Sequence, residues 1–137
     1  MPSMTPQEIR EFLRRPLTVS FTTIRPDGSP HVTPIWFEYA DAKFYCWMDS
    51  STIKVRNVSQ NPHVALCIAT HDEPYKYVIA EGVCEITREG VSERAHSIST
   101  RYQGEERGGE FARQNFNQGS SVLLVVTPTR LLSESAA

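Results

Sequence analysis

The segment Asp49–Asn57 (DSSTIKVRN) combines hydroxyl side chains with two cations, and it predicts an anion-binding turn at the start of a short helix. Three consecutive residues can cap that helix: Ser50, Ser51 and Thr52. The free backbone N–H groups of a first helical turn attract phosphate. Lys54 and Arg56 add positive charge at the same end, where the helix dipole disfavours cations unless an anion meets them. The alternative is that both cations simply extend into water.

A proline interrupts the strand-like run His31–Tyr39 at position 34. Proline has no N–H to donate, so within a sheet it belongs at an edge or a bulge. The backbone between Val32 and Ile35 is then free for a ligand, although a purely structural bulge also explains the proline. The ligand-facing set on this strand is expected to be Val32, Thr33, Pro34 and Ile35.

A tight turn at Ala40–Ala42 joins this strand to the next one, Lys43–Met48. Hairpin geometry then predicts that Thr33–Ile35 and Met48–Ser50 lie at the same end of the sheet. A flat aromatic ligand with a phosphate tail fits that arrangement, with its ring along the strand backbone and its phosphate at the hydroxyl-rich turn. Met48 and Ser50 are therefore also expected to contact it.

Other patterns predict the elements that position this site. Thr5–Glu8 begins a helix that ends before Pro16, and further helices are expected at 52–60, 90–102 and, as a single turn, 110–116. The segment 104–109 reads as a mobile loop. β-Branched and aromatic residues predict six strands: Leu17–Ile24, His31–Tyr39, Lys43–Met48, His63–Thr70, Tyr75–Arg88 (with a bend or bulge at Gly82) and Ser121–Thr127, ended by Pro128.

Six strands in close hairpins with short helices predict a mainly β fold, a closed or half-closed antiparallel barrel that leaves few free edges. The length of 137 residues fits one domain over positions 1–137. A formal net charge of −2 without a basic face argues against nucleic acid and acidic membranes as partners. The first residues lack the apolar core of a signal peptide, and Val122–Val126 is too short to cross a bilayer, so a cytoplasmic protein is expected.

Cysteine and histidine spacing gives no metal site. Three cysteines, none in a C-x-x-C pair, are expected to be buried free thiols, and the four histidines show no ligand spacing. His31 is expected to be a surface histidine of its strand. Four aromatic residues are expected in the barrel core or at a subunit contact, with some at the contact: Trp36, Phe37, Tyr39 and Trp47.

Three motifs follow one another in a characteristic order: Gly28–Phe37 (GSPHVTPIWF), Lys54–Pro62 with its K-x-R-N-V and N-P ends, and Tyr77–Gly82 (YVIAEG). In order and spacing they resemble the pyridoxamine-5′-phosphate-oxidase-like family of FMN- and F420-binding split β-barrels. The resemblance covers about Leu17–Ile86 and the strand Val122–Val126. Within the family the chain is most similar to the small proteins whose cofactor is F420, with FMN as the close competitor.

The resemblance implies a six-stranded Greek-key barrel and a homodimer with a cofactor in each of two interface grooves. It matches Lys54 and Arg56 to the phosphate-contacting cations. The other matched positions are hydroxyl partners of the phosphate (Ser51 and Thr52), a residue that supports the turn or touches the phosphate (Asn57) and the strand under the ring (Val32–Ile35). No acid–base residue is assigned, since the cofactor ring carries the hydride.

The family resemblance therefore implies an F420H2- or FMN-dependent oxidoreductase that moves a hydride between its cofactor and a small conjugated or heteroaromatic substrate. Vitamin B6 oxidation is not expected, because the end of this chain, Leu131–Ala137, lacks the Arg-containing signature of the true oxidases. The alternatives are a non-catalytic flavin or deazaflavin carrier and a tetrapyrrole- or haem-handling relative. The anionic oligoglutamate tail of F420 predicts further cations near Lys54, with Arg25 and Lys76 as candidates.

Overall fold

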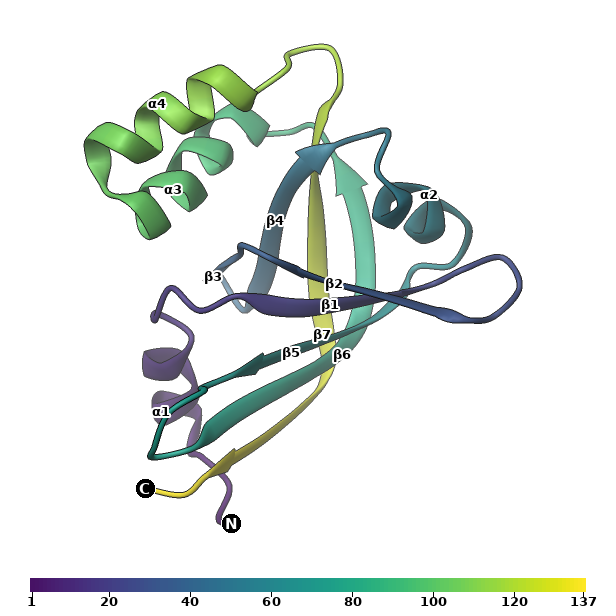
Figure 1. The fold of residues 1–137 in the computed structure, drawn as a ribbon. Helices are drawn as coiled ribbons and strands as arrows, with labels where there is room; N and C mark the ends of the chain where they lie inside the picture. Colours follow the sequence, from purple (N-terminus) through teal and green to yellow (C-terminus); the bar gives the residue numbers. More distant parts are fainter.

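One antiparallel sheet of seven strands forms the body of the computed structural model, which describes all of residues 1–137 (Figure 1). The strands are β1 (Val19–Ile24), β2 (Pro30–Ile35), β3 (Glu38–Ala40), β4 (Lys43–Asp49), β5 (His63–Ala69), β6 (Lys76–Thr87) and β7 (Ser121–Ser135). The helices are α1 (Pro6–Phe12), α2 (Ile53–Gln60), α3 (Val91–Gln103) and α4 (Glu105–Asn115). The strand order is β2-β1-β5-β6-β7-β4-β3, and the sheet curls as a split barrel does, which confirms the predicted fold class.

The strand count is seven instead of the predicted six because the segment predicted as one strand divides at Trp36–Phe37. Its first half, β2, pairs only with β1, and its second half, β3, pairs only with β4. These two halves stand at opposite ends of the strand order, so one stretch of chain links the two edges of the curled sheet. The candidate site lies at this break.

Local signals in the sequence account for most of the other elements. The capping box of α1 is present: the Glu8 N–H donates to Thr5 Oγ1 at 3.2 Å, and the Thr5 N–H donates to Glu8 Oε1 at 2.8 Å. The β1–β2 hairpin turns at Gly28, where φ is +87°. The β3–β4 turn places two non-glycine residues, Asp41 and Ala42, at φ +54° and +61°, as a type I′ hairpin turn requires.

Two local predictions are wrong. Of the segment 104–109, predicted as a loop, residues 105–109 form the first half of α4, because Gly108 allows that helix to approach the α3 backbone. Strand β7 continues past Pro128 to Ser135. A register shift between Glu81 and Gly82 absorbs the proline, as the predicted bulge at Gly82 permits; a Cβ there would lie 2.4 Å from the Thr127 carbonyl oxygen.

The core lies inside the curl of the sheet, where 19 buried side chains form one cluster that includes Phe21, Phe37 and Phe44. Cys46 and Cys84 are buried free thiols, as predicted, whereas Cys67 is only half-buried. Burial raises the pKa of Cys84 to about 12. Helix α1 packs near the C-terminus, and α3 and α4 pack together at the opposite end of the sheet (Figure 1). None of the helices has the length and apolar character to span a membrane.

Candidate functional site

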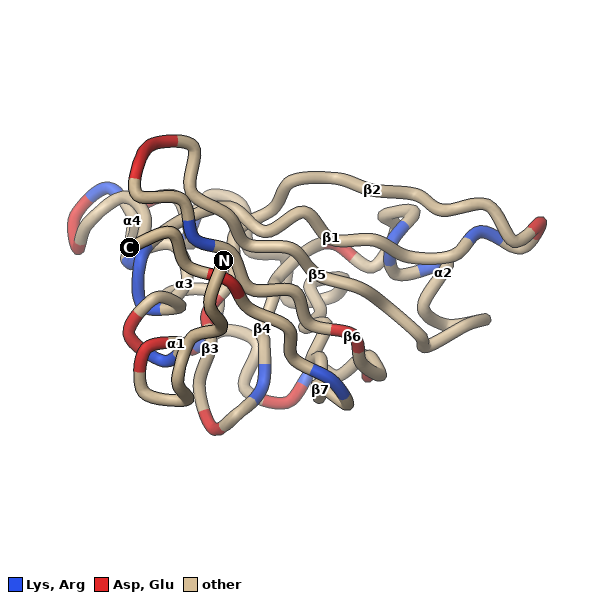
Figure 2. Tube along the Cα trace, turned by 90° about the horizontal axis from the view of Figure 1, so that it is seen from below, with Lys and Arg blue, Asp and Glu red and all other residues tan.

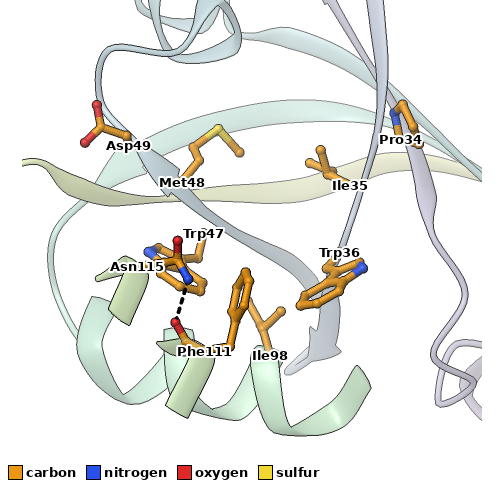
Figure 3. Close-up of a pocket in the computed structure, with 9 residues that line it drawn as sticks. All are labelled: Pro34, Ile35, Trp36, Trp47, Met48, Asp49, Ile98, Phe111 and Asn115. Atoms are coloured by element: carbon orange, nitrogen blue, oxygen red, sulfur yellow. Dashed lines mark hydrogen bonds between the residues drawn. The ribbon is translucent and has the colours of Figure 1, made fainter. Parts of the chain in front are cut away.

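A cleft opens where the β3–β4 hairpin stops pairing. The last pair is Glu38 with Tyr45. Continuing this register by three residues would place Ile35 opposite Met48, but β2 turns away to pair with β1 instead. Between the separated strands lies a cleft of about 390 Å³ (Figure 3). Its strand residues are Pro34, Ile35, Trp36, Trp47, Met48 and Asp49.

Helices α3 and α4 close the cleft from the side. Ile98 of α3 and both Phe111 and Asn115 of α4 complete its lining. The Phe111 ring centroid lies 5.4 Å from that of Trp36 and 6.1 Å from that of Trp47, so aromatic rings form this wall. Figure 3 shows the wall together on one side of the cleft, and the side chains of the two strand ends on the other.

The helix-opening turn predicted to bind an anion follows the C-terminal end of β4, directly after Asp49 of the cleft, where α2 begins. Thr52 is the N-cap of α2, but its side chain makes no capping hydrogen bond. The hydroxyl groups of Thr52 and Ser51 donate instead to Asp49, to its carbonyl and its carboxylate respectively. The backbone N–H groups of the first turn, at Ile53–Val55, therefore find no acceptor in the chain and remain available to an anion.

The two cations of α2 have no ion-pair partner. The ion pairs in the chain are Arg94 with Glu38 and the N-terminal amine with Glu134. Lys54 is half-buried, and this partial burial lowers the pKa of its ammonium group, whereas Arg56 is exposed. Figure 2 shows the two basic segments of α2 next to the β1–β2 hairpin. An unpaired ammonium that has lost part of its water gains from an anionic ligand, which makes this corner suitable for phosphate.

Asp49 holds a fixed negative charge between the cleft and this corner. Its carboxylate accepts hydrogen bonds from the Ser120 hydroxyl, the Ser51 hydroxyl and, at 3.0 Å, the Ser51 N–H. These bonds, with that of Ser120 the strongest contributor, lower the pKa of Asp49 from 3.8 to about 2. The carboxylate is therefore ionised at neutral pH and its hydrogen-bonding capacity is largely filled.

Three further polar side chains lie where α2 meets β1 and on the neighbouring strand β2. Asn57 is 2% exposed and donates from Nδ2 to Thr23 Oγ1 at 3.0 Å, so it ties α2 to β1 and does not face the solvent. On β2, His31 Nδ1 and Thr33 Oγ1 are buried and have no hydrogen-bond partner. Buried polar atoms are nearly always paired, so these two point to a ligand whose polar groups would satisfy them. His31 is half-buried, unlike the surface histidine predicted.

The structure thus brings most of the predicted site residues to one side of the molecule. Pro34, Ile35 and Met48 line the cleft, and residues 50–57 follow directly after Asp49, the last residue of β4 in its lining. Val32 is 59% exposed and lies beside the cleft on the edge strand. The edge position predicted for Pro34 is confirmed, since β2 pairs on one side only.

The two extra cation candidates lie in different places: Lys76 is remote from α2, whereas Arg25 belongs to the β1–β2 hairpin, which lies next to α2 (Figure 2). Lys76 begins β6 and pairs there with Ser135, at the end of the sheet that carries α1 and the C-terminus. The Arg25 guanidinium donates to Pro30 O at 2.7 Å within its own hairpin turn. The residues that the sequence did not indicate are Ile98, Phe111 and Asn115. They approach the cleft only through the packing of α3 and α4, and no local pattern marks that contact.

Solved structures with the same fold include proteins of several kinds. A conserved hypothetical protein from Mycobacterium tuberculosis is 26% identical, with a TM-score of 0.85 over 97% of this chain and 86% of that one. An F420 reductase is 27% identical, with a TM-score of 0.72 over 89% of this chain and 94% of its own. The haem storage protein HutZ from Vibrio cholerae shares the fold at 17% identity, with a TM-score of 0.74 and 92% of each chain covered.

No curated protein matches the chain in sequence. The sequence profile of the pyridoxamine 5′-phosphate oxidase family, in contrast, matches residues 5–133, nearly the whole length. The curled antiparallel sheet and the order of the sequence motifs agree with that match. The chain therefore belongs to the pyridoxamine 5′-phosphate oxidase family of split β-barrels.

Proposed function

We propose that this protein is an oxidoreductase that uses F420, or alternatively FMN, to transfer a hydride to or from a small conjugated or heteroaromatic substrate. The observation that carries the proposal is the α2 corner: two unpaired cations and three free N–H groups at Ile53–Val55 meet the open end of an apolar cleft. The F420 reductase among the similar structures supports F420 as the first candidate.

The residues present fit such a cofactor. Lys54, Arg56 and the first-turn N–H groups of α2 would hold its phosphate, and the Ser50 hydroxyl, which has no partner in the chain, is available as a further donor. Ser51 and Thr52 reach the phosphate if their hydroxyls exchange Asp49 for it. Val32, Thr33, Pro34, Ile35 and Met48 are proposed to flank the ring, and Asn57 to position α2 through Thr23.

When bound, the cofactor supplies the hydride chemistry, so the chain has to orient it and exclude water. The unpaired outer edge of β2 offers backbone groups along one side of the cleft. The orphaned Thr33 Oγ1 and His31 Nδ1 are available to the polar groups of a ring system. The apolar aromatic wall on the opposite side keeps water from the reacting face. None of these roles requires a side chain that donates or accepts a proton.

We also propose a homodimer in which the partner completes the cofactor groove. The strand register places five residues in one row on the outer face of the sheet, across β2, β1, β5, β6 and β7: Pro34, Ser20, Cys67, Ile79 and Leu132. All of them are exposed or half-buried, and four are apolar. An apolar row across the open face of a sheet is typical of a surface that a partner covers. Its edge at Pro34 adjoins the cleft.

A titration with F420 and with FMN, followed by cofactor fluorescence, tests the proposed function. The reduced complex is then mixed with quinone, enone and nitro acceptors. Binding without reduction of any acceptor would favour the carrier alternative, and tight binding of haem instead of either cofactor would favour the tetrapyrrole alternative.

Lys54→Ala is the variant that tests the phosphate corner. It should weaken cofactor binding by about 1.5–3 kcal/mol, the range for hydrogen bonds to charged groups. Lys43→Ala removes a cation at the far end of β4 and serves as the matched control, with unchanged affinity expected. If Lys54→Ala binds the cofactor as tightly as the control does, the corner is not the phosphate site.

A further inference from the structure

We propose that the α3–α4 end of the cleft is the substrate subsite and that it selects uncharged planar aromatic molecules over anionic ones. The proposal rests on the proposed function, because the substrate must lie beside the cofactor ring. It adds three points to that function: an aromatic wall contacts the substrate, the cleft disfavours anionic substrates, and the Asn115 amide can hydrogen-bond to a polar group of the substrate.

Three aromatic rings present partly open faces to this subsite: Trp36, Trp47 and Phe111. All three side chains are half-buried, so each has ring surface left to contact a ligand. Trp36 is held rigidly by Tyr102, whose ring stacks on it at 4.7 Å and 6°. Phe111 is tilted by 46° to Trp36 and lies edge-on to Trp47 at 84°. Rings fixed at such angles favour a flat aromatic guest, which can stack on one ring and meet the edge of another.

Charge in the cleft disfavours an anionic guest. None of the nine lining residues is Lys or Arg, and the one ionisable side chain is the carboxylate of Asp49. Its three hydrogen bonds keep it ionised, and no cation of the lining compensates an added negative charge. An anionic substrate would lose its hydration on entering this apolar space and would also be repelled by Asp49.

Asn115 supplies the polar contact of this subsite. Its Nδ2 donates to the Phe111 carbonyl oxygen at 2.9 Å (Figure 3). The amide oxygen accepts no hydrogen bond from the chain and remains a free acceptor at the rim of the aromatic wall. The second Nδ2–H is also unpaired, so this amide can accept from or donate to a polar group of the guest.

Gly108 positions this wall by letting α4 lie against α3. A Cβ at Gly108 would lie 2.5 Å from Thr100 Cα and 2.6 Å from the Ser99 carbonyl oxygen, so any side chain there displaces α4. Phe111 follows Gly108 by three residues, less than one helical turn, and moves with it. Gly108 is thus a positioning residue for the subsite and does not touch the substrate.

Intrinsic fluorescence reports the occupancy of this subsite directly, since the only two tryptophans of the chain both line the cleft. Three nitroaromatic quenchers of similar ring size serve as probes: 4-nitroaniline, N,N-dimethyl-4-nitroaniline and 4-nitrobenzenesulfonate. With the wild-type protein in phosphate buffer, which occupies the α2 corner, 4-nitroaniline should quench the emission with a Kd at least about tenfold below that of the sulfonate, because the anion meets desolvation and repulsion. The dimethyl compound, which keeps the ring and is also uncharged, should bind about as tightly as 4-nitroaniline, and calorimetry repeats each titration without optical interference.

Variants distinguish the loss of a wall contact from a general loss of structure. Phe111→Ala should raise the Kd of 4-nitroaniline about tenfold, through lost stacking and lost apolar contact. Phe116→Ala, which removes a phenylalanine just beyond α4 and outside the cleft lining, should leave it unchanged. Gly108→Ala should weaken binding as Phe111→Ala does, whereas Gly119→Ala, which meets only ordinary contact, should not. Circular dichroism checks that each variant is folded.

Equal Kd values for 4-nitroaniline and the sulfonate, or an unchanged Kd in folded Phe111→Ala, would overturn the inference. Cofactor binding, which is measured separately by cofactor fluorescence, would be unaffected by that result. If neither F420 nor FMN binds, the proposed function fails by that separate titration, and the substrate role of the subsite fails with it.

Discussion

Asp49 and Lys54 carry opposite charges at the two sides of one short turn, and neither is in an ion pair. Asp49 is stabilised as an anion by hydroxyl and amide donors, whereas Lys54 is destabilised as a cation by partial burial. A phosphate at the start of α2 would stabilise the Lys54 cation and leave the hydrogen bonds to Asp49 in place. The turn therefore combines a structural anion, which organises its hydroxyl groups, with a cation that lacks a partner in the chain.

The lowered pKa of Asp49 predicts an acid-dependent loss of stability. The folded state binds this proton less tightly than the unfolded state, so the stabilisation is complete above the ordinary pKa of 3.8 and is lost as the pH falls toward about 2. Asp49→Asn should lack this component of acid sensitivity. Urea unfolding at pH 6 and at pH 3 measures it, and Asp72→Asn, an exposed aspartate that accepts no hydrogen bond, is the control. Equal pH dependence in the Asp49 variant and the wild type would contradict the assignment.

At the scale of elements, α3 determines where the long edge strand breaks. Arg101 donates from Nε to the Phe37 carbonyl oxygen at 3.0 Å, and its terminal nitrogens donate to the Leu13, Arg14 and Arg15 carbonyl oxygens. The Tyr102 hydroxyl accepts the Phe37 N–H at 3.0 Å and donates to Leu17 O at 2.8 Å. The backbone groups of Phe37 are thus bound by side chains of α3, and the break that opens the cleft is stabilised.

Tyr102→Phe tests this role of α3. The substitution keeps the ring that stacks on Trp36 but leaves the Phe37 N–H without its acceptor. It should lower the free energy of unfolding by about 1–3 kcal/mol, the cost of an unsatisfied buried group. Urea denaturation measures the change. Tyr75→Phe, at a 50% exposed tyrosine whose hydroxyl makes no hydrogen bond, should have little effect, and an equal loss in both variants would refute the role.

At the scale of the whole molecule, the helices leave much of the outer face of the sheet open. Helix α2 packs on β1 and β6, and α3 packs on β4 and β7. In the outer row, Ile79 and Leu132 line an open pocket beside Ile9 of α1, and Cys67 stays half-buried. Opposite charges at Glu81 and Arg130 face each other in the adjacent row. An apolar row next to charges of both signs suits a self-complementary contact between two copies of the chain.

Ile79→Glu tests the proposed homodimer. A carboxylate in the centre of the outer row would be buried without a partner in the dimer, so the variant should be monomeric where the wild type is dimeric. Light scattering coupled to size exclusion measures the mass. Tyr75→Glu adds the same charge at an exposed position in the chain segment before β6 and should leave the mass unchanged. A monomeric wild type, or a variant that remains dimeric, would argue against this face as the interface.

Local sequence was sufficient for much of this protein. The capping box at Thr5 and Glu8, the turns at Gly28 and Asp41 and the edge position of Pro34 all follow from conformational preferences of a few adjacent residues. The K-x-R turn was likewise recognisable from type and spacing. The family and the fold class were predictable because such signals recur in a particular order along the chain.

Tertiary structure alone decided the shape of the cleft. From the sequence, Trp36 and Trp47 fit either a hydrophobic core or an interface. The residues adjacent to them in sequence do not show that both line one cleft at a broken hairpin. Phe111 enters because Gly108 lets α4 approach α3, and the break at Phe37 depends on Arg101 and Tyr102, which lie more than sixty residues away in sequence. These contacts are long-range: their free energy depends on the packing of the whole chain, so no local pattern encodes them.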